Sequence, residues 1–295
     1  MRVTNSMVMH STLSDLNRSL GRLQDSQTEL SSGRSIRRMS DDPTGASSAM
    51  KIRGELRRGD QQSRSLTDAK AWLNTADTAL LAGLDILSKL KEVTVQAGNT
   101  GVGDTTVRQT LAAEIGHLRD DLIGLSNTTY LGRSVFAGTA DGPAYDNTGT
   151  YLGNDAQVIR DVGPGTTVEV NLTGEVLFGS QSSVEGDIFA VLDRLATAVA
   201  SGDTAELATE HDFLDAAAGR WSSGAATIGS RASRLENVEA RNALAEVSLR
   251  DTLSQLEDAD IAEALIGVKA NENAYTAALQ AASRVIPPSL LDYMR

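Results

Sequence analysis

The residue types that most often carry chemistry are sparse in this chain. The sequence contains no cysteine, which excludes a disulfide framework, thiolate metal sites and a cysteine nucleophile. The three histidines are His10, His117 and His211, and no two of them stand with a carboxylate at the spacing of metal ligands. We therefore predict no metal site. We interpret His211, which falls on an apolar helical stripe, as a partly buried structural residue.

Two groups of carboxylates could serve as an acid–base pair or as a cation site. Asp41 and Asp42 are adjacent, so their side chains diverge, and an Asp before Pro43 more often begins a turn. An acidic cluster near the other end of the chain lacks the glycine turn that a calcium loop requires, and it consists of Glu257, Asp258, Asp260 and Glu263. We interpret the pair as a turn and the cluster as a helix face that meets solvent or a basic neighbour.

The glycine-rich middle of the chain gives no phosphate loop. Gly163-Pro164-Gly165 lacks the strand and helix context and the lysine of such a loop, so we predict a turn there. No nucleophile, base and orienting residue form a recognisable set. We predict no catalytic residues, no cofactor and no enzymatic activity, and a hydrolase housed in this middle segment is the alternative from another functional class.

Charge and hydropathy narrow the range of partners. The net charge of -12 argues against nucleic acid, which demands clustered Lys and Arg. Residues 1–64 are locally basic, with eleven Lys and Arg against seven Asp and Glu. Residues 1–30 contain no apolar run of signal-peptide length, and no segment reaches the length of a membrane span. We therefore predict no nucleic-acid binding and no membrane insertion.

Apolar residues recur at spacings of three and four, which predicts long amphipathic helices with narrow apolar seams. A first seam, with Gln27 at its polar position, comprises Met9, Leu13, Leu16, Leu20, Leu23 and Leu30. A second seam, with Gly83 as its gap, comprises Leu66, Ala69, Leu73, Ala76, Leu80, Leu87 and Leu90. A third, entered through Asp104 as N-cap, comprises Leu111, Ile115, Leu118, Leu122 and Leu125.

The second half of the chain is predicted to form one long helix. Asp203, followed three residues later by Glu206, predicts its capped start. The seam that follows comprises Leu207, Leu214, Ala218, Trp221, Ala225, Ile228, Ala232 and Leu235. The register shifts between about Leu249 and Ile261, and the seam then resumes through Leu265, Val268, Tyr275, Leu279, Ala282 and Ile286. Pro287 and Pro288 end this helix.

Between the helical halves, residues 138–180 are rich in glycine and predict short strands and turns. One strand is expected at 167–172, where Val168, Val170 and Leu172 alternate with polar residues, and Gln157–Val162 is a weaker candidate. The predicted fold class is mainly α with a small β insertion. We expect three domains: a terminal coiled coil from 1–40 with 256–295, a helical rod from 41–137 with 186–255, and the β-rich insertion at 138–185.

The terminal helices cannot cover their own apolar stripes, so each needs a partner helix. The economical solution lays the C-terminal helix antiparallel on the N-terminal one, and small residues leave room for packing between copies, namely Ala277, Ala278, Ala281 and Ala282. A purely intramolecular coiled coil is the simpler alternative. The residues expected to form the assembly helices are Leu13, Leu16, Leu20, Leu23, Leu30, Ile261, Leu265, Val268, Tyr275, Leu279 and Ile286.

Sequence runs at both ends resemble one family. Residues 1–4 (MRVT), 27–34 (QTELSSGR) and 40–43 (SDDP) are similar in order and spacing to the N-terminal signature of the flagellin superfamily, and 256–264 (LEDADIAEA) to its C-terminal motif. Within the superfamily, the runs at 41–43 (DDP), 71–73 (AWL) and 131–139 (LGRSVFAGT) look more like hook-associated proteins of the FlgL type. A short filament flagellin is the alternative.

The resemblance implies a structural protein of the bacterial flagellum, with motility as its process and packing as its mechanism. It implies an extracellular homo-oligomeric ring at the hook–filament junction, between the first hook-associated protein and flagellin. It also implies type III export in an unfolded state, without a cleaved signal peptide, after release from an export chaperone.

Overall fold

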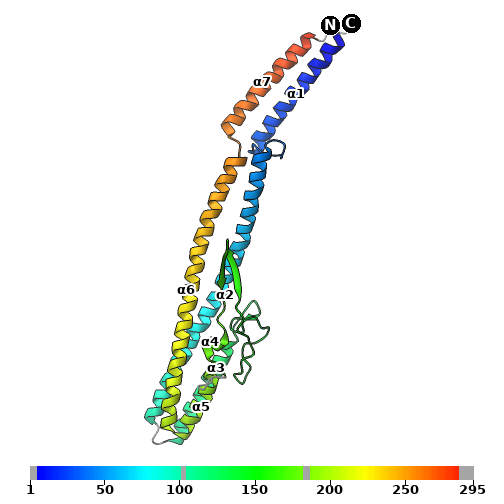
Figure 1. Cartoon of the computed structure of the whole chain (residues 1–295). Coiled ribbons are helices and arrows are strands. Elements are labelled where there is room, and N and C mark those ends of the chain that lie inside the picture. The colour runs from blue at the N-terminus through cyan, green and yellow to red at the C-terminus, as the bar shows by residue number, and fades with distance from the viewer. Residues whose placement is uncertain (1–4, 101–103, 182–186, 286–295) are drawn as a thin grey trace, which may run out of the picture. The chain divides into compact units, whose positions relative to one another are not determined.

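The computed structural model describes residues 5–100, 104–181 and 187–285, and the structural statements that follow concern these residues (Figure 1). The helices are α1 (Asn5–Ser32), α2 (Pro43–Thr100), α3 (Thr105–Ser126), α4 (Gly174–Phe178), α5 (Ile188–Ser201), α6 (Thr204–Glu257) and α7 (Ile261–Val285). The strands are β1 (Thr129–Tyr130), β2 (Arg133–Ser134), β3 (Ile159–Gly163) and β4 (Thr166–Glu169). The predicted fold class, mainly α with a small β insertion, is confirmed.

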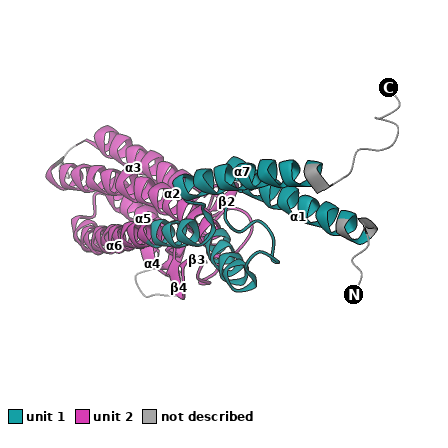
Figure 2. Ribbon diagram, turned by 90° about the horizontal axis from the view of Figure 1, so that it is seen from above, with its two compact units in different colours: residues 1–58, 245–295 teal, residues 59–244 magenta. Residues whose placement is uncertain are grey.

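The chain divides into two compact units (Figure 2). Unit 1 consists of residues 1–58 and 245–295, and unit 2 consists of residues 59–244, including all four strands. The boundary falls within α2 and within α6. The division into three domains that the sequence suggests stays a prediction.

In unit 1, α1 packs against α7 (Figure 1). The Asn271 amide donates a hydrogen bond to Ser26 Oγ at 2.7 Å, while Leu16 lines the same groove as Ala282. Because higher positions on α7 meet lower positions on α1, the two helices are antiparallel. This is the arrangement that the two amphipathic ends require.

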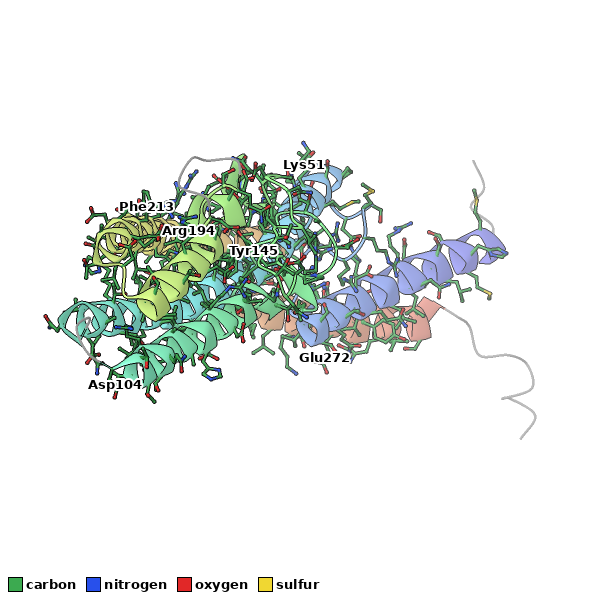
Figure 3. The ribbon with its side chains drawn as sticks, turned by 90° about the horizontal axis from the view of Figure 1, so that it is seen from below. Lys51, Asp104, Tyr145, Arg194, Phe213 and Glu272 are labelled. Atoms are coloured by element: carbon green, nitrogen blue, oxygen red, sulfur yellow. The ribbon has the colours of Figure 1, made fainter. Side chains whose placement is uncertain are left out.

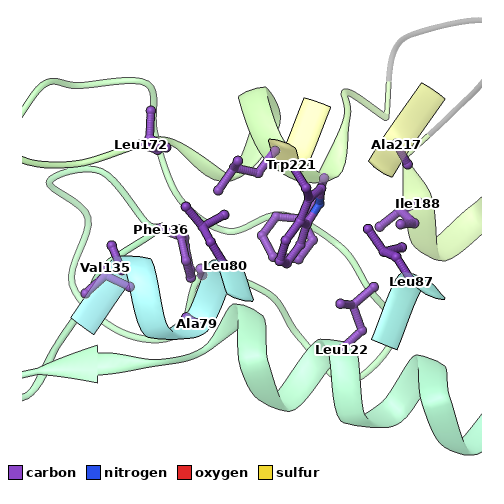
Figure 4. Packing of buried hydrophobic residues seen from close by; sticks show 14 of the residues in the cluster. Ala79, Leu80, Leu87, Leu122, Val135, Phe136, Leu172, Ile188, Ala217 and Trp221 are labelled. Carbon is purple, nitrogen blue, oxygen red and sulfur yellow. The ribbon is translucent and has the colours of Figure 1, made fainter. Parts of the chain in front are cut away.

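Unit 2 contains a hydrophobic core built by α2, α3, α5, α6 and the segment between α3 and α5 (Figure 4). Every residue of the predicted second seam, Leu66 to Leu90, is buried. On α6 the residues buried at heptad spacing are Leu214, Trp221, Ile228 and Leu235. The spacing of apolar residues therefore predicts which helix positions face the core of unit 2.

Ion pairs join neighbouring helices around this core. Lys70 pairs with Glu239 and Lys91 with Asp215, linking α2 to α6. The Arg194 guanidinium on α5 binds Glu210 on α6 through Nε at 2.6 Å and lies 6.0 Å from the Phe213 ring (Figure 3). Since Glu210 is buried, this pair holds α5 against the first turns of α6.

The strands form two small antiparallel hairpins, of which β1–β2 precedes the predicted β insertion and β3–β4 lies within it. In the larger one, β3 pairs with β4 around a turn at Gly165, whose φ of +64° suits glycine. Arg160 on β3 donates to Asp68 on α2 at 2.8 Å, and Arg231 on α6 donates to Glu169 on β4 at 2.7 Å. The hairpin is therefore fastened to both long helices, and the predicted turn at 163–165 is present.

The helix starts follow the expected capping chemistry. The Asp104 carboxylate accepts from the Thr106 N–H at 2.9 Å and caps α3. The Asp203 carboxylate accepts from the N–H groups of Ala205 and Glu206 at 3.0 and 3.2 Å and caps α6. Both caps were predicted from the residue types alone.

One predicted helix is in fact two. The long helix expected from 203 onward ends at Glu257, and α7 begins at Ile261. The Asp260 carboxylate accepts from the Ala262 N–H at 2.8 Å, so a new N-cap stands where the seam shifts register. The expectation of continuous helix through 258–260 is therefore wrong.

Candidate assembly surface

The residues that could do chemistry do not come together. Within the described ranges 5–100, 104–181 and 187–285, no group of three or more His, Asp or Glu side chains could hold a metal ion. His211 is partly buried and lies 4.0 Å from Asp215, on the apolar face of α6. In the same described ranges, no helix is both long and apolar enough to cross a membrane.

The pair Asp41 and Asp42 forms the turn that the sequence predicts. The Asp41 carboxylate accepts from the backbone N–H groups of Arg38 at 2.8 Å and Arg37 at 3.2 Å. These hydrogen bonds, chiefly that of Arg38, lower the pKa of Asp41. Asp42 accepts from the Thr44 N–H at 3.0 Å, and Pro43 occupies the first position of α2.

The acidic cluster at 257–263 does not form a single helix face. Glu257 is only 4% exposed and binds Arg53, whose guanidinium nitrogen lies 2.5 Å from Glu257 Oε2. Asp260 caps α7, and Glu263 lies in the first turn of that helix. The expected basic neighbour exists for Glu257, whereas the expected helix face is interrupted by the break between α6 and α7.

The predicted assembly residues of α1 face its partner helix to different degrees. Leu23 is buried, Leu16, Leu20 and Leu30 are half-buried, and Leu13 is 53% exposed. Gln27, predicted as the polar position of this seam, is exposed, and Ser26 takes that place with its hydrogen bond to Asn271. The expectation for Gln27 is wrong by one residue.

On α7 the predicted assembly residues fall on two different faces. The face that meets α1 is built largely from small residues at heptad spacing, with Val268 and Tyr275 half-buried among them, and comprises Ala264, Val268, Asn271, Tyr275, Ala278 and Ala282. Beside it runs an exposed stripe, hereafter the outer stripe, with Ile261 at 67%, Leu265 at 50% and Leu279 at 42% exposure. Ile266, at 70% exposure, is turned by about 100° from Leu265 and lies on a further face of the helix. Ile286 lies outside the described residues.

A groove lies between α1 and α7, at the end distant from the break at 258–260. It has a volume of about 260 Å³ and is lined by Met9, Thr12, Leu13, Leu16, Leu279, Ala282 and Ser283. Leu13 and Leu279 are large apolar side chains that are exposed in the single chain. Unit 1 thus presents apolar surface along both of its terminal helices.

The polar surface of α7 lies beside this apolar surface. Lys269 pairs with Glu272 at 2.9 Å, and this carboxylate raises the pKa of the Lys269 ammonium. Charged and apolar residues are thus interspersed on one exposed helix. Such a pattern suits packing beside other helices more than it suits a catalytic cleft.

Comparison with known proteins accords with these features. Residues 3–141 match the family described as the bacterial flagellin N-terminal helical region. The chain is 28% identical to a flagellin of Bacillus subtilis over 89% of both chains. It is also 28% identical to flagellar hook-associated protein 3 of Salmonella typhimurium over 62% of this chain and 58% of that protein.

Among solved structures, flagellar hook-associated protein 3 from Legionella pneumophila matches 70% of this chain and 98% of its own, with a TM-score of 0.61 and 17% identity. This likeness concerns the fold. Together with the matched N-terminal region, the terminal sequence runs and the antiparallel pairing of α1 with α7, it gives one conclusion. Residues 3–141 belong to the family of the bacterial flagellin N-terminal helical region, and the chain has the fold of hook-associated protein 3.

Proposed function

We propose that this protein joins the hook to the filament of a bacterial flagellum and that it assembles by packing unit 1 between copies. The observation that carries the proposal is the outer stripe of α7, Ile261, Leu265 and Leu279, which stays largely exposed among the residues that the structure describes. Similarity to structural proteins of the flagellum supports the same role.

Burial of this stripe would contribute substantially to association. Fully burying a Leu or Ile side chain is worth about 1.5–3 kcal/mol, so residues already half-buried gain about half of that each. Three such residues, together with Leu13 across the groove, give several kcal/mol for each contact, before the cost of association. Contacts repeated around a ring would then hold each copy on two sides.

Charge supports contact between unlike parts of neighbouring copies. Residues 1–58 hold ten Lys and Arg against six Asp and Glu, whereas residues 245–295 hold four against eight. Unit 1 is therefore neutral as a whole, and the net charge of -12 belongs to unit 2. Opposite charges on the two halves of unit 1 favour the C-terminal half of one copy beside the N-terminal half of the next.

The remaining parts of the proposal rest on the superfamily resemblance. The protein would form a homo-oligomeric ring, contact the first hook-associated protein on one side and flagellin on the other, and bind an export chaperone before secretion. Export would use the flagellar type III channel, without a cleaved signal peptide. Its role would be structural, with no enzymatic activity.

A short flagellin that forms the filament itself is the second candidate. The likeness to the Bacillus subtilis flagellin extends over 89% of both chains, which favours this reading more than a local match would. The two roles differ in copy number and in position along the organelle.

Immunogold labelling of isolated flagella separates the two roles. A single band at the distal end of the hook is the result expected of a junction protein. Gold particles along the whole filament would exclude the junction role and support the second candidate. Labelling of an otherwise identical strain that lacks the gene provides the control for antibody specificity.

A further inference from the structure

The two short non-helical segments of unit 1 are joined by backbone hydrogen bonds. One lies between α1 and α2, at residues 33–42, and the other between α6 and α7, at residues 258–260. The Ser35 N–H donates to the Glu257 carbonyl at 2.8 Å, and the Ala259 N–H donates to the Gly33 carbonyl at 2.9 Å. Arg34 and Asp258 form an antiparallel bridge between these bonds.

An ion pair between a buried carboxylate and a partly exposed guanidinium lies at the same place. Glu257, the last residue of α6, is 4% exposed, and its carboxylate lies 2.5 Å from the guanidinium of Arg53 on α2. A buried carboxylate is costly unless it is paired, so Glu257 holds its position only while Arg53 is beside it. The ion pair and the backbone bonds together are called the clamp here.

The seam between α1 and α7 repeats with a period of seven residues. Its polar marker is the hydrogen bond from Asn271 to Ser26. Hydroxyl residues recur every seven positions on this face of α1, at Thr12, Ser19 and Ser26. Ser19 is buried and Thr12 is half-buried. A slide of α1 by one heptad, about 10 Å, would offer Asn271 the hydroxyl of Ser19 in place of Ser26.

The facing surface of α7 has the same repeat. Ala264, Asn271 and Ala278 lie seven residues apart on it, and Val268, Tyr275 and Ala282 form a second heptad row. The small side chains of α7 can pack against either set of α1 leucines, because the packed volume changes little between the two registers. Packing alone therefore favours one register over the other only weakly. A repeat of this kind needs a separate device to select one register.

We propose that the clamp is this device: it holds α1 and α7 in the register that pairs Ser26 with Asn271, and opening it lets α1 slide by one heptad toward the break. The slide would carry the last residues of α1 past the start of α7. The bonds of Gly33 and Ser35 to the 257–259 segment block this movement. The inference concerns the isolated chain and stands apart from the proposed role at the junction.

Paired cysteine substitutions in the full chain test the proposal, since the native sequence has no cysteine. Ser26→Cys with Asn271→Cys reports the observed register, and Ser19→Cys with Asn271→Cys reports the slipped one. Both reporters remove the Asn271 hydrogen bond, so the clamp alone is left to set the register. Intramolecular disulfide yield is measured at low protein concentration by mass spectrometry of the linked peptides.

With the clamp intact, the first reporter forms its disulfide in high yield and the second in low yield. Glu257→Gln raises the yield of the second by about tenfold, a change that corresponds to about 1.4 kcal/mol. Glu246→Gln, which removes a pair with Arg250 near the same end of α6, is the matched control and leaves the yield unchanged.

Ser35→Pro opens the clamp from the other side, because proline lacks the N–H that bonds to Glu257 and the ion pair is left in place. It should produce the same slipped disulfide, so the test survives if Glu257→Gln prevents folding. If, in the folded variants, the yield of the second reporter stays at the level of the Glu246→Gln control, the clamp does not set the register and the proposal is wrong.

Discussion

The indole ring of Trp221 occupies the space where residue 83 would carry a side chain. A Cβ atom on Gly83 would lie 1.7 Å from an indole carbon of Trp221, so only glycine fits between α2 and α6 at this point. Both residues are buried, and the Trp221 ring also packs edge-on against Phe178 at 5.0 Å (Figure 4). The gap in the seam of α2 thus accommodates one of the two tryptophan side chains of the core.

Gly83→Ala should therefore destabilise unit 2. Alanine favours helix over glycine by about 1 kcal/mol, but displacing the indole costs more, and we expect a net loss of about 2–3 kcal/mol. Gly116→Ala on α3 is the matched control, because no atom lies within 4 Å of its added Cβ, and it should stabilise by about 0.5–1 kcal/mol. Urea unfolding measures both, and equal effects of the two substitutions would contradict this packing.

Glu210→Gln should weaken the attachment of α5 to α6. Glu210 is buried and binds Arg194 through two nitrogens, at 2.6 and 3.0 Å. Because Arg194 is itself partly exposed, we expect a loss of about 2 kcal/mol, less than for a fully buried pair. Asp120→Asn, which removes an exposed partner of Arg119, should change stability by less than about 0.5 kcal/mol. Thermal unfolding of the two variants side by side makes the comparison.

Unit 2 should lose stability at alkaline pH through its buried tyrosines. Burial raises the pKa of Tyr145, and burial raises that of Tyr151 to about 12. An unfolded chain ionises its tyrosines near pH 10, so the stabilisation is complete below pH 10 and is lost as pH rises toward 12. Circular dichroism and tyrosinate absorbance should change together. Ionisation of every tyrosine near pH 10, with the fold intact, would contradict the burial.

Asp260→Ala should loosen the first turn of α7. The carboxylate accepts from the N–H groups of Ala262 and Glu263, and losing such a cap costs about 1 kcal/mol. Hydrogen exchange of residues 261–264 should quicken relative to the end of the helix. Asp260→Asn is the control, because its amide oxygen still accepts these bonds; an equal increase in exchange for both variants would argue against capping.

The helical seams and the starts of α3 and α6 follow from sequence alone because they depend on residues a few positions apart. Leu66 to Leu90 and Leu214 to Leu235 are spaced for burial, and Asp104 and Asp203 carry the chemistry of caps. The contact between Trp221 and Gly83 could not be predicted in the same way, because the two residues are distant in sequence. The spacing of apolar residues shows only that the seam has a gap at Gly83. Contacts of this kind require the folded chain.

The break at 258–260 was within reach of the sequence. Asp260 with Glu263 three residues later is the same capping pattern that marks the start of α6 at Asp203. The seam also shifts register there, but such a shift is compatible with one continuous helix as well as with a break. The pairing of Glu257 with Arg53, by contrast, joins residues 204 positions apart and leaves no local signal.

The assembly surface was only partly predictable. Leu265 and Val268 stand on the same apolar pattern in the sequence, yet Val268 faces α1 and Leu265 is half exposed. A periodicity identifies an apolar stripe without telling which edge meets the partner within the chain. The seven-residue spacing of Thr12, Ser19 and Ser26 is visible in the sequence. Its structural role follows only from the position of Asn271 on the facing helix.

The most direct test of this account is electron cryomicroscopy of isolated flagella at a resolution that places side chains at the hook–filament junction. We predict density for this chain there, with α1 and α7 antiparallel and with Ile261, Leu265 and Leu279 covered by an adjacent molecule. Density for this chain in which those three side chains face solvent, or in which the two terminal helices are separated from each other, would contradict the account.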